Sequence, residues 1–310
     1  MLDLKDRKIL AELDLDARIL QATLAKKVRL SKQVVGYRIQ RLEKKDIIQG
    51  YYALIDLARL GTTIHVVYLK LTGIPSAQED AWMEEIDAHP DVLGVARTIG
   101  TWDMTIALQS SSASHLYSLL KDITAKKHSH IAAQRITSEL DSTYFNLRML
   151  HDIGIRSLRT SKGHTSIDQT DQKIIHTLSH DCRTSLVKMS QDIDMTANAI
   201  KHRIQNLEKR GIILGYRTKI NYEKLGYLHF RVFLRLQRPD FYDNIVSYLQ
   251  RKKNIESVSR YIGYADVDFR CRVRTITQLY ALIADLKDTF LKDIMDIESL
   301  PIFHWKKMRY

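Results

Sequence analysis

Apolar residues recur at helical spacing through the first sixty residues of the chain. Asp3 is a candidate N-cap of a first helix, with Asp6 in the position that completes a capping box. A second amphipathic stretch covers residues 20–28. After a short turn, Ser31 is placed to cap a third helix, whose apolar stripe is formed by Val35, Ile39 and Leu42. The pattern predicts three short helices with a tight turn before the third, followed by a β-favouring stretch over residues 47–55.

The remainder of the first half alternates between strand and helix patterns. The predicted order is strand 65–71, helix 77–88, strands 92–99 and 102–108, helix 113–125 and strand 131–140. The two central strands form a hairpin that turns at Gly100 and Thr101. The order βαββαβ is typical of a ferredoxin-like sandwich, a four-stranded antiparallel sheet with both helices on one face.

The chain repeats itself with an offset of about 165 residues. Leu2–Leu71 aligns with Ile167–Leu236 without a gap, and after a small change in length Arg97–Gly100 aligns with Arg260–Gly263. We therefore predict an α+β fold of two tandem units, each a winged-helix-like helix-turn-helix domain followed by a ferredoxin-like βαββαβ sandwich. The expected boundaries are 1–60 and 167–226 for the helix-turn-helix domains, 61–150 and 227–310 for the α/β sandwiches, and 151–166 for a linker.

The linker of residues 151–166 is polar and has no clean apolar period. It carries Arg156, Arg159 and Lys162 against the single acid Asp152. This composition favours a flexible basic connector. The alternative is an arm that adds contacts to phosphates.

Composition narrows the class of partner. The 310 residues carry 48 Lys and Arg against 36 Asp and Glu, and the net charge of +12 favours a polyanion, either nucleic acid or an acidic membrane. No apolar run approaches the roughly 18 residues of a membrane helix, and the charged N-terminus is unlike a signal peptide. The two cysteines, Cys182 and Cys271, lack CxxC spacing, so we expect the reducing cytoplasm.

The sequence shows no pattern typical of an enzyme. Neither cysteine has a recognisable base and carboxylate partner, and the glycine motifs that cradle phosphates are absent, so we predict no catalytic residues and no cofactor. His176 and His180 have the i, i+4 spacing of a metal pair, but the first copy has Ala11 and Leu15 at these positions. We therefore predict no metal site.

The third helix of each copy has a face suited to DNA. Its apolar stripe would dock on the first two helices, which leaves the opposite face free to enter a major groove. Gln and Asn can pair with adenine edges and Lys with guanine, while basic residues contact phosphates. The predicted DNA-binding residues are Ser31, Lys32, Gln33, Tyr37, Arg38, Gln40, Arg41 and Lys44 in the first copy, and Thr196, Asn198, Lys201, His202, Arg203, Gln205 and Lys209 in the second. Among these, we assign Arg38, Arg41, Lys44, Arg203 and Lys209 to phosphates, and Gln33 and Asn198 to bases.

Three motifs occur at the positions that define this helical unit. They are Asp-x-x-Asp-x-Lys-Ile-Leu from Asp3, Leu-Ala-x-x-Val-x-Leu-Ser from Leu24, and Arg-Ile-x-Arg-Leu-Glu-x-x-x-Ile-Ile-x-Gly-Tyr from Arg38. With them the chain resembles the Lrp/AsnC family of feast/famine transcription regulators, twice and over nearly its whole length. The resemblance implies double-stranded DNA as partner, homodimers or higher oligomers formed through the sheet domains, and modulation by an amino acid or another small molecule.

The resemblance also implies a small-molecule site at the loop between the second and third strands of each sheet. The matching residues are Gly100, Trp102, Asp103, Gly263, Tyr264 and Asp266. Each carboxylate there could accept hydrogen bonds from an α-amino group. The alternative is that Asp103 and Asp266 only cap their hairpins.

The chain departs from the family in two ways. The family usually has one unit per chain, so the duplication changes the expected oligomer pattern. The turn glycine common in the family is Arg29 in the first copy and Asp194 in the second. Asp tolerates a left-handed conformation better than Arg, so we expect mild strain in the first turn.

The faces of the two sheets that carry no helices differ in charge. The first copy has Val66, Tyr68, Lys70, Thr105, Ala107 and Gln109 there, and the second has Arg231, Phe233, Arg235, Asp268, Arg270 and Arg272. Because arginines are costly to bury without partners, we expect the two sheets to pack on each other within a chain, with Asp268 and carbonyls satisfying the arginines. The alternative is a basic face that holds an anionic ligand.

Together these patterns predict a sequence-specific DNA-binding regulator whose two helix-turn-helix domains, here called its heads, read unlike half-sites. One alternative is an enzyme similar to siroheme decarboxylases, which share the two-module architecture and act on a carboxylate-rich tetrapyrrole. That function would need the arginines of the second sheet. The other alternative is an architectural DNA-binding protein of low specificity, favoured by the net charge.

Overall fold

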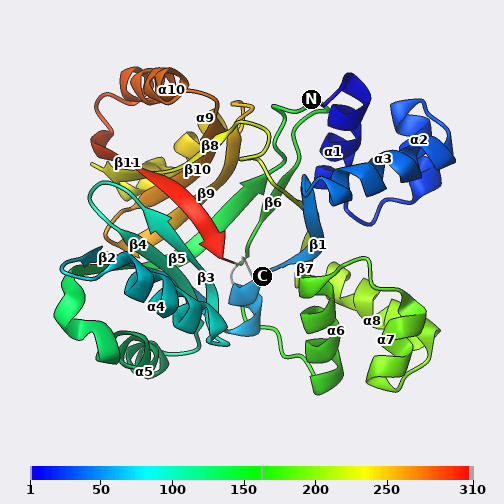
Figure 1. Ribbon diagram of the computed structural model, residues 1–310, viewed down its shortest axis with the longest axis horizontal. Coiled ribbons are helices and arrows are strands. Elements are labelled where there is room, and N and C mark those ends of the chain that lie inside the picture. Colours follow the sequence, from blue (N-terminus) through cyan, green and yellow to red (C-terminus); the bar gives the residue numbers. More distant parts are fainter. Residues whose placement is uncertain (1, 162, 307–310) are drawn as a thin grey trace.

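The computed structural model describes residues 2–161 and 163–306 of the chain. Two helix-turn-helix units lie on one side of the molecule and two α/β sandwiches on the other (Figure 1). The first helical unit consists of α1 (Leu4–Leu15), α2 (Gln21–Val28), α3 (Lys32–Lys44) and β1 (Ile48–Ile55). The second consists of α6 (Gln169–His180), α7 (Leu186–Ile193), α8 (Ala197–Lys209) and β7 (Ile213–Ile220). The two tandem units predicted from the repeat are confirmed.

The helices begin where the sequence places their caps. Asp3 accepts a hydrogen bond from the Asp6 amide at 2.8 Å, and the two residues form the expected capping box. Ser31 caps α3 by accepting from the Val34 amide at 3.2 Å, and Thr196 caps α8 in the same way. The apolar stripes of both third helices are buried, as predicted: Val35, Ile39, Leu42, Ile200, Ile204 and Leu207.

The turns before α3 and α8 contain a non-glycine residue in the left-handed region. Arg29 has φ 55° and Asp194 has φ 58°. A left-handed conformation costs a residue with a Cβ roughly 1–2 kcal/mol, and less for Asp, whose short polar side chain forms local hydrogen bonds. The sequence had indicated strain in the first turn, and the left-handed φ of Arg29 agrees with it.

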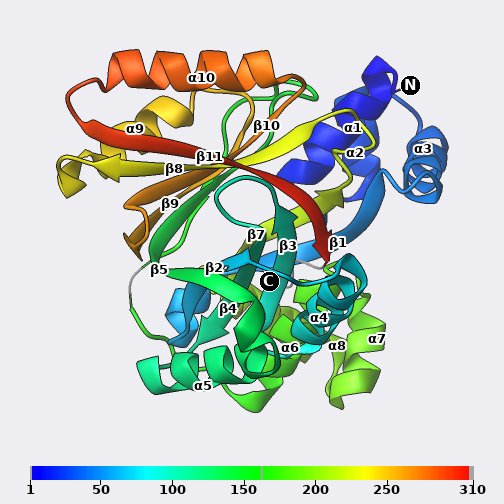
Figure 2. The ribbon, with the colours of Figure 1, turned by 60° about the vertical axis from the view of Figure 1, so that its left-hand side comes forward.

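Each sandwich has the predicted βαββαβ order. The first contains β2 (Thr63–Leu71), α4 (Ser76–Ala88), β3 (Val92–Thr98), β4 (Met104–Ser110), α5 (Ala113–Thr124) and β5 (Ile131–Phe145). The second contains β8 (Leu228–Leu236), α9 (Tyr242–Leu249), β9 (Ile255–Gly263), β10 (Val267–Val273), α10 (Ile276–Thr289) and β11 (Ile294–Lys306). Short 3-10 turns lie at Leu57–Leu60, Ala125–His130 and Pro239–Phe241. The helices cover the two outer faces and the sheets lie between them (Figure 2).

The two sheets are joined strand to strand within the chain. The strand order is β2-β4-β3-β11-β8-β10-β9-β5, and β5 also pairs with β2, which closes the ring. β5 and β11 make this possible because each is long enough to leave its own sheet and pair with the other, β5 with β9 and β11 with β3. The inner faces of the sheets are therefore occupied within one chain. The homodimer or higher oligomer stays a prediction.

Packing of the sheets within one chain, the first of the two alternatives, is confirmed. The inner faces meet in an apolar cluster that includes Tyr68, Trp102 and Phe233. Arg231 is buried there, donates to Asp268, and donates to the Tyr261 hydroxyl at 2.9 Å. Arg270 and Arg272 both face Glu256, at 3.9 and 3.0 Å. Three of the four arginines of this face thus find acidic partners, as burial requires, while Arg235 is exposed.

Within the predicted linker, residues 156–161 are joined to the rest of the chain. β6 (Ser157–Arg159) adds a short strand to the end of β5. Arg156 donates to the Leu15 carbonyl at 2.8 Å, and the Ser161 amide donates to Asp56 at 2.8 Å. Arg159 lies 3.3 Å from both Asp141 and Asp243, so its charge is partnered. Lys162 lies outside the described residues.

For the residues that it describes, the structure adds two negative observations and one observation on the cysteines. Among them, no helix is long and apolar enough to cross a membrane. No cluster of three or more His, Cys, Asp or Glu side chains that could hold a metal occurs in this part of the chain. Cys182 and Cys271 are buried, and burial raises the pKa of each thiol to about 12, so both are protonated and packed in the core.

Candidate nucleic-acid interface

The outer face of α3 is exposed and polar. Lys32, Gln33, Tyr37, Gln40 and Lys44 all point to solvent, with the Tyr37 ring 66% exposed. The face also has a shallow hollow lined by Gln21, Lys32, Gln33, Gly36, Tyr37 and Gln40. The opposite side packs on α1 and α2, so this surface is the one left free to enter a groove.

The corresponding face of α8 carries different chemistry. Asn198, Lys201, His202, Gln205 and Lys209 are exposed. Position by position, Lys201 stands where α3 has Gly36, and His202 where it has Tyr37. The two helices therefore share a scaffold and present unlike groups to a partner.

The arginines assigned to phosphates have another partner in the structure. Arg38 lies 2.6 Å from Asp3 and 2.8 Å from the buried Asp6, and Arg41 lies 2.6 Å from Asp6. The Arg38 guanidinium holds the pKa of Asp3 below its ordinary value. In the second copy, Arg203 pairs with Asp168 and Asp171 in the same geometry. These pairs fasten α3 to the start of α1, and α8 to the start of α6.

The phosphate contacts of Arg38, Arg41 and Arg203 thus stay a prediction, and a substitution there would disturb the fold as well as binding. Lys44 and Lys209 are exposed at the ends of their helices. Within the described residues neither has an ion pair, so their charges are available to a polyanion.

The strands that follow α3 and α8 pair with each other. β1 and β7 form a two-stranded antiparallel ribbon, with Tyr51 opposite Thr218 and Ala53 opposite Tyr216. The apolar residues of both helical units merge into one core around this ribbon. The two heads are therefore fixed relative to each other, which the sequence did not reveal because it predicted each strand without a partner.

Residues that match between the copies form the seam beside the ribbon. The Ala17 amide donates to the Tyr216 carbonyl at 3.1 Å, and the Cys182 amide donates to the Tyr51 carbonyl at 3.0 Å. Arg18 lies over the Tyr216 ring at 5.0 Å, and Arg183 over the Tyr51 ring at 3.6 Å. The sequence had aligned Arg18 with Arg183 without assigning either a role. The presence of arginine at this position in both copies is the feature of the sequence that could have indicated the seam.

The residues predicted for an effector have structural roles. Asp103 accepts from the Leu71 amide at 2.7 Å and lies 3.0 Å from the Lys70 ammonium, while Asp266 accepts from the Leu236 amide at 2.8 Å. Each carboxylate ties its hairpin loop to the end of the neighbouring strand, β2 or β8, outside the hairpin itself. Trp102 is buried against Tyr264, with ring centroids 5.4 Å apart. An effector contact at these positions stays a prediction.

Gly263 has a packing reason to be glycine. A Cβ there would lie 2.3 Å from the Ile136 carbonyl oxygen, and its φ is +128°. The residue therefore allows β5 to approach β9. Gly100 also has a positive φ, but a Cβ there would meet no atom within 4 Å.

Comparison with known proteins identifies both helical units. Residues 2–49 match the family of winged helix-turn-helix DNA-binding domains, and residues 167–208 match the AsnC-type helix-turn-helix domain. An uncharacterised HTH-type transcriptional regulator of Pyrococcus abyssi is 32% identical over 126 residues, which cover 39% of this chain and 82% of that protein. A similar regulator of Pyrococcus furiosus is 29% identical over 132 residues, 42% of this chain and 85% of that protein. Each of these relatives thus corresponds to about one copy of the repeat.

A solved structure matches the whole chain. The siroheme decarboxylase NirDL has a TM-score of 0.65, with 99% of this chain and 94% of that chain covered, at 10% sequence identity. It has also been solved in complex with an iron-uroporphyrin III analogue, again with a TM-score of 0.65. At this identity the match shows that the two-unit fold exists in another protein, and it carries no information about chemistry.

Proposed function

Because the chain belongs to the Lrp/AsnC family of helix-turn-helix, DNA-binding transcription regulators, we propose that one molecule reads a DNA site made of two unlike half-sites. The observation that carries the proposal is the β1–β7 ribbon, which fixes α3 and α8 as a pair within one chain. Two-fold helix-turn-helix dimers read half-sites one helical turn or a multiple apart. Here both helix-turn-helix units belong to one chain, and the exposed faces of their third helices differ.

The base-reading groups would come from the first two turns of each third helix. Gln33 occupies the position of Asn198, and both amides can form the bidentate contact with adenine. Lys201 of α8 can donate to guanine, whereas Gly36 at the same position of α3 has no side chain to do so. The two half-sites should therefore differ most at the base pairs that face these positions.

The proposed stoichiometry follows from the same pairing. Since one chain supplies both heads and pairs its own sheets, we expect one chain per bipartite site. The net charge of +12 and the free Lys44 and Lys209 supply the sequence-independent part of the affinity, which should fall with salt. We keep the cytoplasm as the predicted location.

The test is selection of bound duplexes from a randomised library with the full chain. The expected result is an enriched motif of two unlike halves at constant spacing, bound by one chain in sedimentation measurements. A palindromic motif would contradict the unlike half-sites. Retention without enrichment would favour the architectural alternative, and no retention at low salt would overturn DNA binding.

A siroheme-decarboxylase-like activity has one observation in its favour, the shared two-unit fold. The basic face that it would need is largely neutralised, since Arg231 pairs with Asp268 and Arg272 with Glu256. The cavity nearest that face has a volume of about 320 Å³, at the lower end of the range for small-molecule sites and small for a tetrapyrrole. We therefore propose a role without catalysis.

A further inference from the structure

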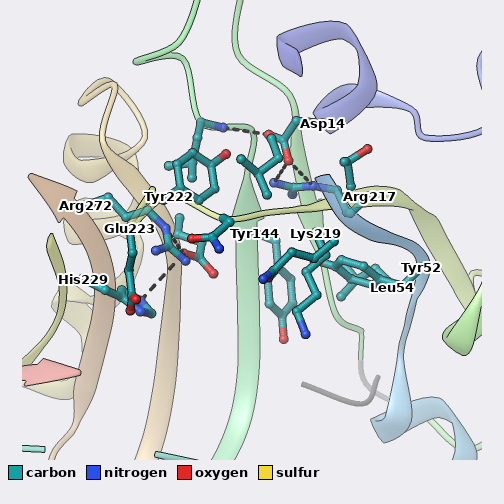
Figure 3. Close-up of a pocket in the computed structure, with 16 residues that line it drawn as sticks. Asp14, Tyr52, Leu54, Tyr144, Arg217, Lys219, Tyr222, Glu223, His229 and Arg272 are labelled. Carbon is teal, nitrogen blue, oxygen red and sulfur yellow. Dashed lines mark hydrogen bonds and ion pairs between the residues drawn. The ribbon is translucent and has the colours of Figure 1, made fainter. Parts of the chain in front are cut away.

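A cavity of about 320 Å³ lies between the ribbon that joins the two heads and the sheet of the second sandwich (Figure 3). Its lining comes from α1, β1 and β7 on the side of the heads, from β8, β9 and β10 on the side of the sheet, and from the end of β5. The residues predicted for an effector do not contribute to it. The cavity is thus a separate place in the fold.

Two buried polar atoms of the lining lack a hydrogen-bond partner within the described chain, the Tyr222 hydroxyl and His229 Nε2, which lies 3.8 Å from Glu256, beyond hydrogen-bond distance. Tyr222 is 5% exposed and His229 4% exposed. Burial raises the pKa of Tyr222 well above its ordinary value and lowers that of His229 well below it, so both are neutral. Because buried polar groups are nearly always hydrogen-bonded, these two atoms indicate an occupant that supplies the missing partners.

The lining carries as many acidic as basic side chains, and the inner acids are already paired. Asp14 pairs with Arg217 at 2.8 Å (Figure 3), and Glu256 pairs with Arg272 at 3.0 Å. Lys219, which is half-buried, has no ion pair among the described residues. The remaining carboxylate, Glu223, is exposed to solvent. An anionic group in the cavity would therefore meet a free ammonium, whereas a buried ammonium would find both inner carboxylates occupied.

The rest of the wall combines the polar residues Gln49, Thr218 and Asn221 with aromatic and aliphatic side chains. Three tyrosine rings and three aliphatic side chains line it: Tyr52, Tyr144, Tyr222, Leu54, Leu147 and Ile220. Arg272 lies over the Tyr222 ring at 4.5 Å and holds it in place. Such walls favour an aromatic body, since aromatic pairs gain from stacked or edge-on contact.

We propose that this cavity binds a small aromatic carboxylate that lacks an α-amino group, such as an aryl 2-oxo acid, and that its occupancy changes DNA binding. The carboxylate accepts from Lys219 and Tyr222, and His229 is the remaining polar contact. The effect on DNA rests on the proposed function, because the ligand touches the ribbon that sets the spacing of the heads. By reciprocity, DNA must change the ligand affinity by the same factor.

The binding test is titration calorimetry on the full chain with phenylpyruvate, 4-hydroxyphenylpyruvate and indole-3-pyruvate, each beside its matching amino acid. We expect at least one oxo acid to bind, with its amino acid about tenfold weaker or more. Tyr222→Phe removes only the hydroxyl and Lys219→Met only the charge, and each should weaken binding about tenfold. Lys287→Met, an exposed lysine of α10 away from the cavity, is the matched control and should leave binding unchanged.

The proposed site is overturned if none of the three oxo acids binds, if the amino acids bind equally well, or if Tyr222→Phe and Lys219→Met bind like the control. Thermal unfolding of each variant shows that it is folded. DNA affinity is measured separately without ligand, so a failure to bind DNA counts against the proposed function alone. Ligand binding with unchanged DNA affinity would overturn the coupling and leave the site in place.

Discussion

The two copies of the repeat agree where they touch each other and differ where a partner would touch them. At the seam, Arg18 and Arg183 contact equivalent tyrosines in the opposite copy. On the reading helices, Tyr37 of α3 corresponds to His202 of α8. The comparison teaches that the contacts between the two units have been kept in both copies, while the exposed faces of α3 and α8 have diverged.

The copies also differ in how charge is distributed inside them. The inner face of the first sheet carries Val66 and Thr105, and the second carries Arg231 and Asp268 at the same positions. At the heads, the buried Asp6 receives two close arginines, whereas Asp171 receives Arg203 at 2.9 Å and Arg210 only at 3.9 Å. Substitutions that make one copy like the other measure what each difference contributes.

The largest loss of stability is expected when Asp268 of the second sheet is replaced and its partner Arg231 is kept. Asp268→Thr leaves Arg231 buried without its charge partner and should lower the free energy of unfolding by about 3–5 kcal/mol. The double variant Arg231→Met with Asp268→Thr restores a neutral inner face and should recover most of this loss. Urea unfolding measures both. Equal losses in the single and double variants would show that the ion pair is not the cause.

The next largest effect on stability differs between the two helix-turn-helix units. Asp6→Asn removes a carboxylate that holds two arginines and should cost about 2–3 kcal/mol of stability. Asp171→Asn removes one close pair and should cost roughly 1 kcal/mol less. The same unfolding measurement applies. If the two variants were equally destabilised, the second arginine at Asp6 would contribute nothing.

A smaller effect concerns the sequence that is read. Gln33→Ala should relax base preference in one half-site and Asn198→Ala in the other, each by about tenfold at the contacted base pair. Library selection with each variant measures this. Leu20→Ala, an exposed position before α2, serves as a control for the helical unit. An unchanged motif for both variants would argue against base reading by these amides.

The smallest effect concerns the turns. Arg29→Gly relieves a left-handed residue and should raise the stability by about 0.5 kcal/mol, the strain relieved less the entropy cost of glycine. Asp194→Gly should change it by a few tenths at most, because Asp already tolerates this conformation. Thermal unfolding detects the difference. A larger gain for Asp194→Gly would reverse the assignment of strain.

The sequence predicted the parts of the site that depend on near neighbours. The caps at Ser31 and Thr196 and the exposed faces of α3 and α8 follow from spacing within a few turns, and the structure has them where expected. It did not predict that Arg38 would bind Asp3 and Asp6. A guanidinium on that helix could face a groove or the first helix, and periodicity is the same in both cases.

By itself, the sequence determined the helices, the strands, their repetition and the unlike chemistry of the two reading faces, since these follow from residue types and their local periods. Only the tertiary structure decided that β1 pairs with β7, that residues 157–159 become a strand, and that a cavity opens beside Tyr222 and His229. The physical reason is distance along the chain. The partners of β1 lie more than a hundred residues away, and even β6 pairs with residues outside any local period, so how the finished elements fit together selects these pairs.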